Sequence, residues 1–186
     1  MAQTPSTMLP LGTIAPPFSL PDTVSGATLS LAELKSPQAT VVMFICNHCP
    51  YVIHLRAGLS QLARDYQPRG VAFIAISSND VEHYPQDAPD LMRAFAQTSG
   101  FGFPYLYDQS QDVARAYQAA CTPDFFVFDG ALTLAYRGQF DDARPGNGRP
   151  VTGAAMRAAL DALLAGGVVS EDQVPSVGCN IKWKRA

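Results

Sequence analysis

Two of the four cysteines, Cys46 and Cys49, are separated by only two residues. Side chains three positions apart in a helical turn are neighbours, and their Cα atoms lie within the range that a disulfide bond spans. The pair can therefore open and close with little backbone movement. The alternatives are two buried, inert thiols, or half of a zinc site. Zinc takes four ligands, however, and Cys121 and Cys179 each stand alone in the sequence, so we expect redox chemistry and no metal.

The residues beside the two cysteines favour a reactive thiol. The first turn of a helix has unpaired N–H groups and the positive end of the helix dipole, which both stabilise a thiolate. An imidazolium at His48 would lower the thiol pKa further and make the disulfide more oxidising. Asn47 offers an amide donor, and Pro50 suits the first turn of a helix. We assign Cys46 and Cys49 as catalytic and these three residues as modulating; whether Cys46 or Cys49 caps the helix stays open.

A second motif, Thr122-Pro123-Asp124, opens an apolar strand. A proline that enters a strand cannot donate a ladder hydrogen bond. The motif fits if the Thr122–Pro123 peptide is cis, which would present backbone to a docking partner; the alternative is an ordinary trans turn. We therefore predict substrate docking at Thr122 and Pro123. Asp124 and His48 are candidate proton acceptors for Cys49, each with simple surface solvation as the alternative.

Hydrophobic patterning predicts an alternation of strands and helices. Buried apolar runs predict strands at 39–45 and 71–77, with further strands at 18–22, 27–31, 104–107, 124–129 and 132–137. Apolar residues at helical spacing predict helices over 52–66, 91–98, 111–119 and 156–164. This order indicates an α/β fold, with a mixed sheet covered by helices on both faces. Cys46 follows the strand 39–45, where the ligand crevice of such a sheet lies.

Composition limits the class of protein. A chain of 186 residues that is 47% hydrophobic and 16% charged can bury a sizeable core, so we predict one domain over 1–186, with a core of about 10–165 and a tail of about 167–186. Scattered Lys and Arg argue against nucleic acid, and no apolar run is long enough to span a membrane. The first residues lack the features of a signal peptide, so we expect a cytoplasmic protein.

The order of motifs resembles the thioredoxin fold. A strand ending in C-x-x-C is followed by a helix, two further βα segments and Thr-Pro opening a hairpin. The lead-in strands and the extra segment 78–103 are similar to the peroxiredoxin-like AhpC/TSA, or redoxin, branch. The runs 46–52, 121–129 and 178–184 resemble a bacterial thioredoxin-like subgroup with a CNHC motif. The resemblance implies a three-layer fold with an N-terminal strand extension and a C-terminal tail, a redox pair at Cys46 and Cys49, and a cis-proline loop at Thr122-Pro123.

The sequence departs from both parent patterns. Ile45 stands where thioredoxin has a tryptophan, and the preceding strand lacks thioredoxin's buried acid. Aligned on Cys49, the peroxiredoxin Pro-x-x-x-Thr-x-x-Cys pattern has Val42 and Cys46 at its proline and threonine positions. The activating arginine of that family would fall near Pro123, where none exists. The set of residues with which peroxiredoxins reduce peroxides is therefore incomplete in this sequence.

These observations predict a thiol–disulfide oxidoreductase without a cofactor. Cys46 would attack a disulfide in a protein or low-molecular-weight thiol partner, and Cys49 would resolve the mixed disulfide. The first alternative is a thiol peroxidase that reduces a hydroperoxide, with Cys49 as the peroxidatic cysteine and Cys46 resolving. The second is a non-catalytic metal-binding or scaffold domain.

The two remaining cysteines have an auxiliary interpretation. Cys121 precedes Thr122 and should lie close to the redox face without joining the pair. Cys179 lies in a tail of about 20 residues, which is long enough to cross a small domain. Cys179 is therefore a candidate auxiliary thiol that relays or protects the disulfide; the alternative is two buried, inert thiols.

Overall fold

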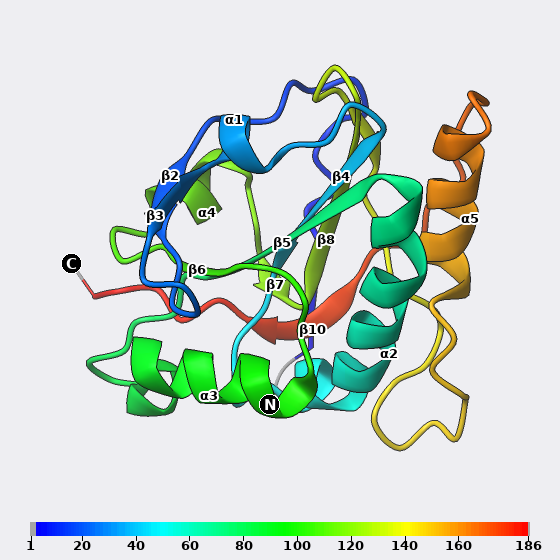
Figure 1. The fold of residues 1–186 in the computed structure, drawn as a ribbon. Coiled ribbons are helices and arrows are strands. Elements are labelled where there is room, and N and C mark those ends of the chain that lie inside the picture. Colours follow the sequence, from blue (N-terminus) through cyan, green and yellow to red (C-terminus); the bar gives the residue numbers. More distant parts are fainter. Residues whose placement is uncertain (1–2, 186) are drawn as a thin grey trace.

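The computed structural model describes residues 3–185, and its centre is a five-stranded mixed sheet. The strand order is β6-β5-β4-β8-β9 (Figure 1). The bounds are β4 Ala39–Phe44, β5 Val71–Ser77, β6 Tyr105–Tyr107, β8 Asp124–Asp129 and β9 Leu134–Tyr136. β5 pairs in parallel with both β4 and β6, whereas β8 is antiparallel to β4 and β9. β4 and β5 are therefore interior strands, which explains their continuous apolar runs.

Helices cover both faces of this sheet. Alternate side chains of a strand point to opposite faces, so Val41 and Met43 pack on one side of β4, and Val42 and Phe44 on the other. The first side is covered by α2 (Pro50–Tyr66), α3 (Pro89–Ser99) and α5 (Ala154–Leu164). The second is covered by α1 (Leu31–Leu34), α4 (Asp112–Ala116) and the hairpin of β2 (Ser19–Pro21) and β3 (Thr28–Ser30). The expected three layers are thus present.

One predicted helix needs adjustment. The helix expected over 111–119 is shorter in the structure, because Gln118 adopts a positive φ of 50° that ends the helical path. The polar segment after β5 contains the 3-10 turn η2 (Pro85–Asp87), and a second such turn, η1 (Gln67–Arg69), follows α2. Within the described residues, no helix is long and apolar enough to cross a membrane.

The C-terminal tail contains a strand that the sequence pattern did not predict. β10 (Val177–Asn180) pairs antiparallel with β1 (Thr4–Pro5) on one side and with β7 (Cys121–Thr122) on the other. In Figure 1, β10 is the red arrow that crosses below the central sheet, beside the start of α2. The run is short and contains a glycine, so intrinsic strand propensity is weak. The strand forms because the edge of β7 supplies its hydrogen-bonding partners.

Candidate active site

The Cys46–Cys49 motif joins the end of β4 to the start of α2. The Ile45 N–H still donates to the Ile76 carbonyl of β5, at 2.9 Å, so the sheet holds the chain up to the residue before the motif. Cys49 is the N-cap residue of α2 and Pro50 its first helical residue, while Cys46 lies in the preceding turn. Both cysteines are free thiols and are fully buried. The structure therefore decides the capping question that the sequence left open.

The Thr122-Pro123 motif lies directly against the two thiols. Cys46 Sγ is 3.4 Å from Thr122 Oγ1, and the Cys49 thiol donates to the Thr122 carbonyl at 3.0 Å. The Thr122–Pro123 peptide is cis, the first of the two alternatives considered above. The structure thus brings together two motifs that are more than 70 residues apart.

A buried carboxylate, Asp87, organises the loop that carries the motif. It accepts hydrogen bonds from the Asn47 backbone N–H at 2.8 Å and from Asn79 Nδ2 at 2.8 Å, and it pairs with His48 Nδ1 at 2.7 Å. Asn47 is fixed further, because its Oδ1 accepts a hydrogen bond from the Tyr105 hydroxyl at 3.1 Å. The modulating residues Asn47 and His48 are therefore both anchored to one fully buried acid.

Sequence reasoning missed Asp87. It lies in η2, inside a polar, turn-rich segment in which no residue pattern distinguishes Asp87 from the other acidic residues. The available signal was positional: Asn79 closely follows β5, and the ends of adjacent parallel strands meet at the same edge of a sheet. That signal would indicate the segment as a neighbour of Cys46, without selecting Asp87 within it.

Hydrogen bonding, burial and charge shift the pKa values of the two thiols in opposite directions. A hydrogen bond from Cys46 lowers the pKa of Cys49 to about 5, against the opposing effect of burial; Thr122 and the backbone of Val52 contribute further hydrogen bonds. The pKa of Cys46 is raised well above its ordinary value by that same hydrogen bond, by burial and by the charge of Asp87. Of the reduced pair, Cys49 is therefore the thiol that ionises first, and a Cys49 thiolate gives up the hydrogen bond that the thiol donates to the Thr122 carbonyl.

The charged form of Asp87 is supported by its donors. Burial disfavours the carboxylate, but the hydrogen bonds from His48 and Asn79 outweigh it and hold the pKa of Asp87 below its usual value. The His48 ring also stacks on Tyr84, with 5.8 Å between the ring centroids. The site therefore keeps a negative charge next to Cys46 at neutral pH.

Asp124, one of the two candidate proton acceptors, does not contact Cys49 through any of its hydrogen bonds. It is completely buried rather than solvated, and it pairs with Arg137 at 3.1 Å and accepts from the Ala120 N–H at 3.0 Å. Arg137, which the sequence reasoning did not select, is also fully buried and lies 3.9 Å from the Phe126 ring centroid. The expected role of Asp124 at Cys49 is thus not supported by the geometry.

The other two cysteines lie close to the pair. The Cys121 thiol donates to the Pro123 carbonyl at 3.5 Å, and burial raises its pKa. Cys179 is directly opposite Thr122 in the β7–β10 ladder. Burial, together with the hydrogen bonding and charge of Cys49, raises the pKa of Cys179 to about 12.

One cluster among the described residues has the composition of a metal site. The donor atoms of Cys46, His48 and Asp87 all lie within 4.8 Å of one another. Zinc needs four ligands, or three and an open position for water. The Asp87 oxygens already accept three hydrogen bonds, including the one from His48. A metal bound through His48 Nδ1 would compete with the His48–Asp87 pair.

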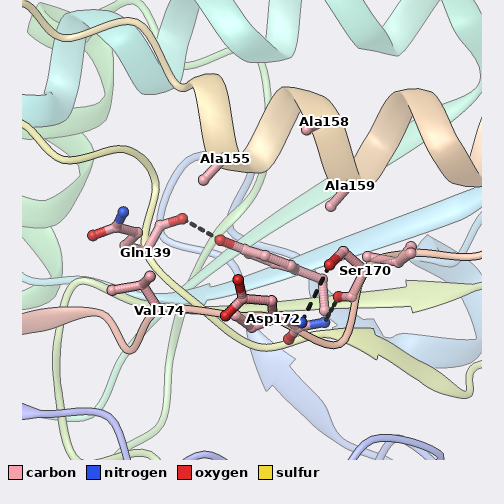
Figure 2. A pocket seen from close by; sticks show the side chains of 10 residues that line it. Gln139, Ala155, Ala158, Ala159, Ser170, Asp172 and Val174 are labelled. Atoms are coloured by element: carbon pink, nitrogen blue, oxygen red, sulfur yellow. Dashed lines mark hydrogen bonds between the residues drawn. The ribbon is translucent and has the colours of Figure 1, made fainter.

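A cavity of about 190 Å³ lies apart from the thiols, between α5 and the chain that follows it. Figure 2 shows Ala155, Ala158 and Ala159 of α5 above Ser170, Asp172 and Val174 of the tail. None of the four cysteines lines this cavity. This cavity is therefore separate from the candidate active site, which is a cluster of buried thiols.

The sheet order, the thiol pair at a helix start and the cis-proline loop define a thioredoxin-like fold of the redoxin type. Residues 11–137 match the AhpC/TSA family, and the chain belongs to that family. No curated protein matches the sequence.

Solved structures agree with this assignment. The chain is 56% identical to an uncharacterized conserved protein from Geobacillus kaustophilus, with a TM-score of 0.98 over 100% of this chain and 98% of that one. It is 51% identical to a hypothetical protein from Sinorhizobium meliloti 1021, with a TM-score of 0.96 over 98% and 100%. The thioredoxin domain of a thiol-disulfide oxidoreductase from Bacteroides vulgatus, at 17% identity, covers 69% of this chain and 88% of its own with a TM-score of 0.58, which shows the shared fold.

Proposed function

We propose that the protein is a thiol–disulfide oxidoreductase that cycles Cys46 and Cys49 between dithiol and disulfide. The observation that carries this proposal is a pair of buried thiols at the N-terminus of α2, each in hydrogen-bond contact with Thr122. Membership of the AhpC/TSA family supports redox chemistry at cysteine. The partner is a disulfide-bearing protein or a low-molecular-weight thiol compound, taken from the reducing environment of a cytoplasm.

In the mechanism that we propose, Cys46 is the attacking group and the Cys49 thiolate is the base that takes its proton. Cys46 passes its proton to the Cys49 thiolate as its Sγ bonds to one sulfur of the partner disulfide, and the other partner sulfur leaves as a thiolate. Cys49 then loses that proton to water and attacks Cys46 Sγ. The Cys46–Cys49 bond forms and the second partner sulfur leaves. The partner gains two electrons and the cysteine pair loses two.

The mechanism is tested by trapping. Cys49→Ser should accumulate mixed disulfides through Cys46, because nothing resolves them, whereas Cys121→Ser should trap none and keep wild-type turnover. Mixed disulfides trapped instead on Cys49 in a Cys46→Ser variant would reverse the two roles. No trapped species, together with a wild type inactive towards insulin and glutathione disulfide, would exclude the proposed function.

A redox titration gives the direction of electron flow. Thioredoxin has a reduction potential of about −270 mV, and the strong oxidant DsbA of about −120 mV. Because His48 lies in the motif and stabilises a nearby negative charge when protonated, we expect a value between the two. A potential below that of thioredoxin would contradict this expectation.

A thiol peroxidase is the second candidate. The lowered pKa of Cys49, to about 5, and its position at the start of α2 favour Cys49 as a peroxidatic thiolate. Arg137, however, makes its side-chain ion pair with Asp124 and donates no hydrogen bond to Cys49. Stopped-flow oxidation by hydrogen peroxide separates the candidates: a rate like that of an ordinary free thiol supports disulfide exchange, and one orders of magnitude faster supports the peroxidase.

The metal-binding alternative rests on the cluster of Cys46, His48 and Asp87. Metal analysis of protein purified under reducing conditions tests it directly. Stoichiometric zinc that is lost in Cys46→Ser would favour this alternative over disulfide exchange. Sub-stoichiometric metal in the wild type would exclude it.

A further inference from the structure

The chain's own C-terminal strand occupies the edge of β7 beside the redox pair. In the β7–β10 ladder, Cys179 lies opposite Thr122 and Asn180 opposite Cys121. The other edge of β10 pairs with β1, so β10 is the middle strand of this small sheet. This is the arrangement of β-augmentation, in which an added strand presents a side chain to a site, except that the added strand belongs to the same chain.

The fit of β10 against Thr122 and Pro123 is close. A Cβ atom on Gly178 would lie 1.9 Å from the Thr122 carbonyl oxygen, so only glycine allows this approach. Next to it, the Ser176 hydroxyl donates to the Pro123 carbonyl at 2.7 Å. The strand is therefore fitted to the cis-proline loop rather than loosely laid over it.

The residues after β10 are tied to the network around the CNHC motif. The Lys182 N–H donates to Asn79 Oδ1 at 2.9 Å, and the amide group of the same Asn79 donates to Asp87. The Ile181 N–H donates to the Ala120 carbonyl at 3.2 Å. Both ends of the strand are thus held, and Cys179 between them is fixed at the site.

Cys179 belongs to the same buried cluster as Cys46 and Cys49, and only 3% of it is exposed. Cys179 lies opposite Thr122 in the ladder, and the Cys49 thiol donates to the carbonyl of the same Thr122 at 3.0 Å. We propose that Cys179 is the third thiol of the redox centre, so that the disulfide moves between Cys46–Cys49 and Cys49–Cys179. This proposal rests on the proposed function and names an internal partner for the same pair.

The transfer balances without any outside oxidant. Starting from the Cys46–Cys49 disulfide, Cys179 gives its proton to water and its thiolate attacks Cys49 Sγ. The Cys49–Cys179 bond forms, the Cys46–Cys49 bond breaks, and Cys46 leaves with the electron pair and takes up a proton. The new bond ties β10 covalently to the start of α2 and leaves Cys46 as a free thiol.

The electrostatics of Cys179 change in the direction that this step needs. In the reduced protein, its pKa is raised by burial and then by the hydrogen bond to Cys49 and the charge on Cys49. Once Cys49 is in a disulfide, it carries no charge, and the second and third causes disappear. Oxidation of the first pair therefore makes Cys179 easier to ionise.

A variant with two cysteines tests the inference. Cys46→Ser combined with Cys121→Ser keeps only Cys49 and Cys179, and oxidation with glutathione disulfide should convert it to the Cys49–Cys179 disulfide, read by peptide mapping. The matched control, Cys46→Ser with Cys49→Ser, keeps Cys121 and Cys179 and should give no internal disulfide. Gly178→Val, which displaces β10, should lose most of the Cys49–Cys179 bond but still form Cys46–Cys49.

The wild type supplies a second measurement that does not depend on how the variants fold. Under limiting glutathione disulfide, acid quenching and mapping should find a fraction of molecules with Cys49–Cys179. Its absence at every degree of oxidation, or glutathione on Cys49 in place of the internal bond in the two-cysteine variant, overturns the inference. Such a result leaves the proposed function intact if Cys46–Cys49 still forms, whereas failure to form Cys46–Cys49 in the wild type refutes the proposed function itself.

Discussion

Asp87 and Asp124 are both completely buried carboxylates, yet their surroundings differ sharply. Asp87 faces donors from three residues, the Asn47 N–H, His48 and Asn79, and its pKa is lowered. Asp124 has a full opposite charge beside it in Arg137, but burial outweighs that charge and raises its pKa. The two pKa values therefore shift in opposite directions, because hydrogen bonds outweigh burial at Asp87 whereas burial outweighs the opposite charge at Asp124.

The difference extends to unsatisfied atoms. Among the described residues, Asp124 Oδ1 and two nitrogens of Arg137, Nε and Nη1, are buried without a hydrogen-bond partner, while both oxygens of Asp87 are engaged. A buried ion pair repays its desolvation only with good geometry and further hydrogen bonds. Asp124–Arg137 is thus a costly structural pair, whereas Asp87 forms a complete network that positions the redox motif.

The largest expected effect is on stability, at the Asp124–Arg137 pair. Arg137→Leu should lower the free energy of unfolding by about 3–5 kcal/mol, because it leaves a buried charge without its partner. The double variant Asp124→Leu/Arg137→Leu should recover most of this loss. Urea unfolding measures both, and a single variant as stable as the wild type would contradict the comparison.

The loss in Arg137→Leu should depend on pH. A carboxyl whose folded-state pKa is raised contributes stability that is present below its unfolded-state pKa, about 3.9, and lost as pH rises through the folded-state value. The penalty should therefore shrink as pH falls and Asp124 takes up a proton. A penalty that grows in acid would show that Asp124 is not the group responsible.

Asp87→Asn should have a smaller effect on stability and a specific effect on the thiols. Its amide group would face existing donors, which costs about 1–3 kcal/mol for the unsatisfied groups. Loss of the charge should lower the pKa of Cys46 and make the disulfide more oxidising, by about 30 mV for each 1.4 kcal/mol. The control is Asp80→Asn, since Asp80 pairs with His83 and not with the motif. An unchanged reduction potential of the Cys46–Cys49 disulfide in Asp87→Asn would contradict the role of Asp87 as a positioning residue.

The smallest effect concerns the titration of Cys49. Its thiolate, followed by ultraviolet absorbance in the reduced protein, should appear with a midpoint at pH about 5. Cys46→Ala removes the hydrogen bond that lowers this pKa most, so the midpoint should rise. Asp124→Asn should leave the midpoint in place, because Asp124 makes no hydrogen bond to Cys49. A shift as large in Asp124→Asn as in Cys46→Ala would contradict the conclusion that Asp124 does not act on the thiol pair.

Much of the framework could be predicted from local pattern. The strands β4 and β5 and the helix α2 lie where expected. A strand buried on both faces gives a continuous apolar run, and a helix buried along one stripe gives apolar residues at helical spacing. The Cys46–Cys49 pair and the Thr122-Pro123 motif also carried a chemical signal. No local pattern selected Asp87 or Arg137, since their roles depend on partners that only the fold brings to them.

The sequence by itself determined the alternation of strands and helices, and the presence of two cysteines at helical spacing before a helix-starting proline. These are local properties of residue type and spacing. Only the tertiary structure decided that Cys49 caps α2, that Asp87 anchors Asn47 and His48, and that β10 brings Cys179 to the pair. The second and third of these depend on hydrogen bonds between segments tens of residues apart, whose formation requires the folded sheet that brings their ends together.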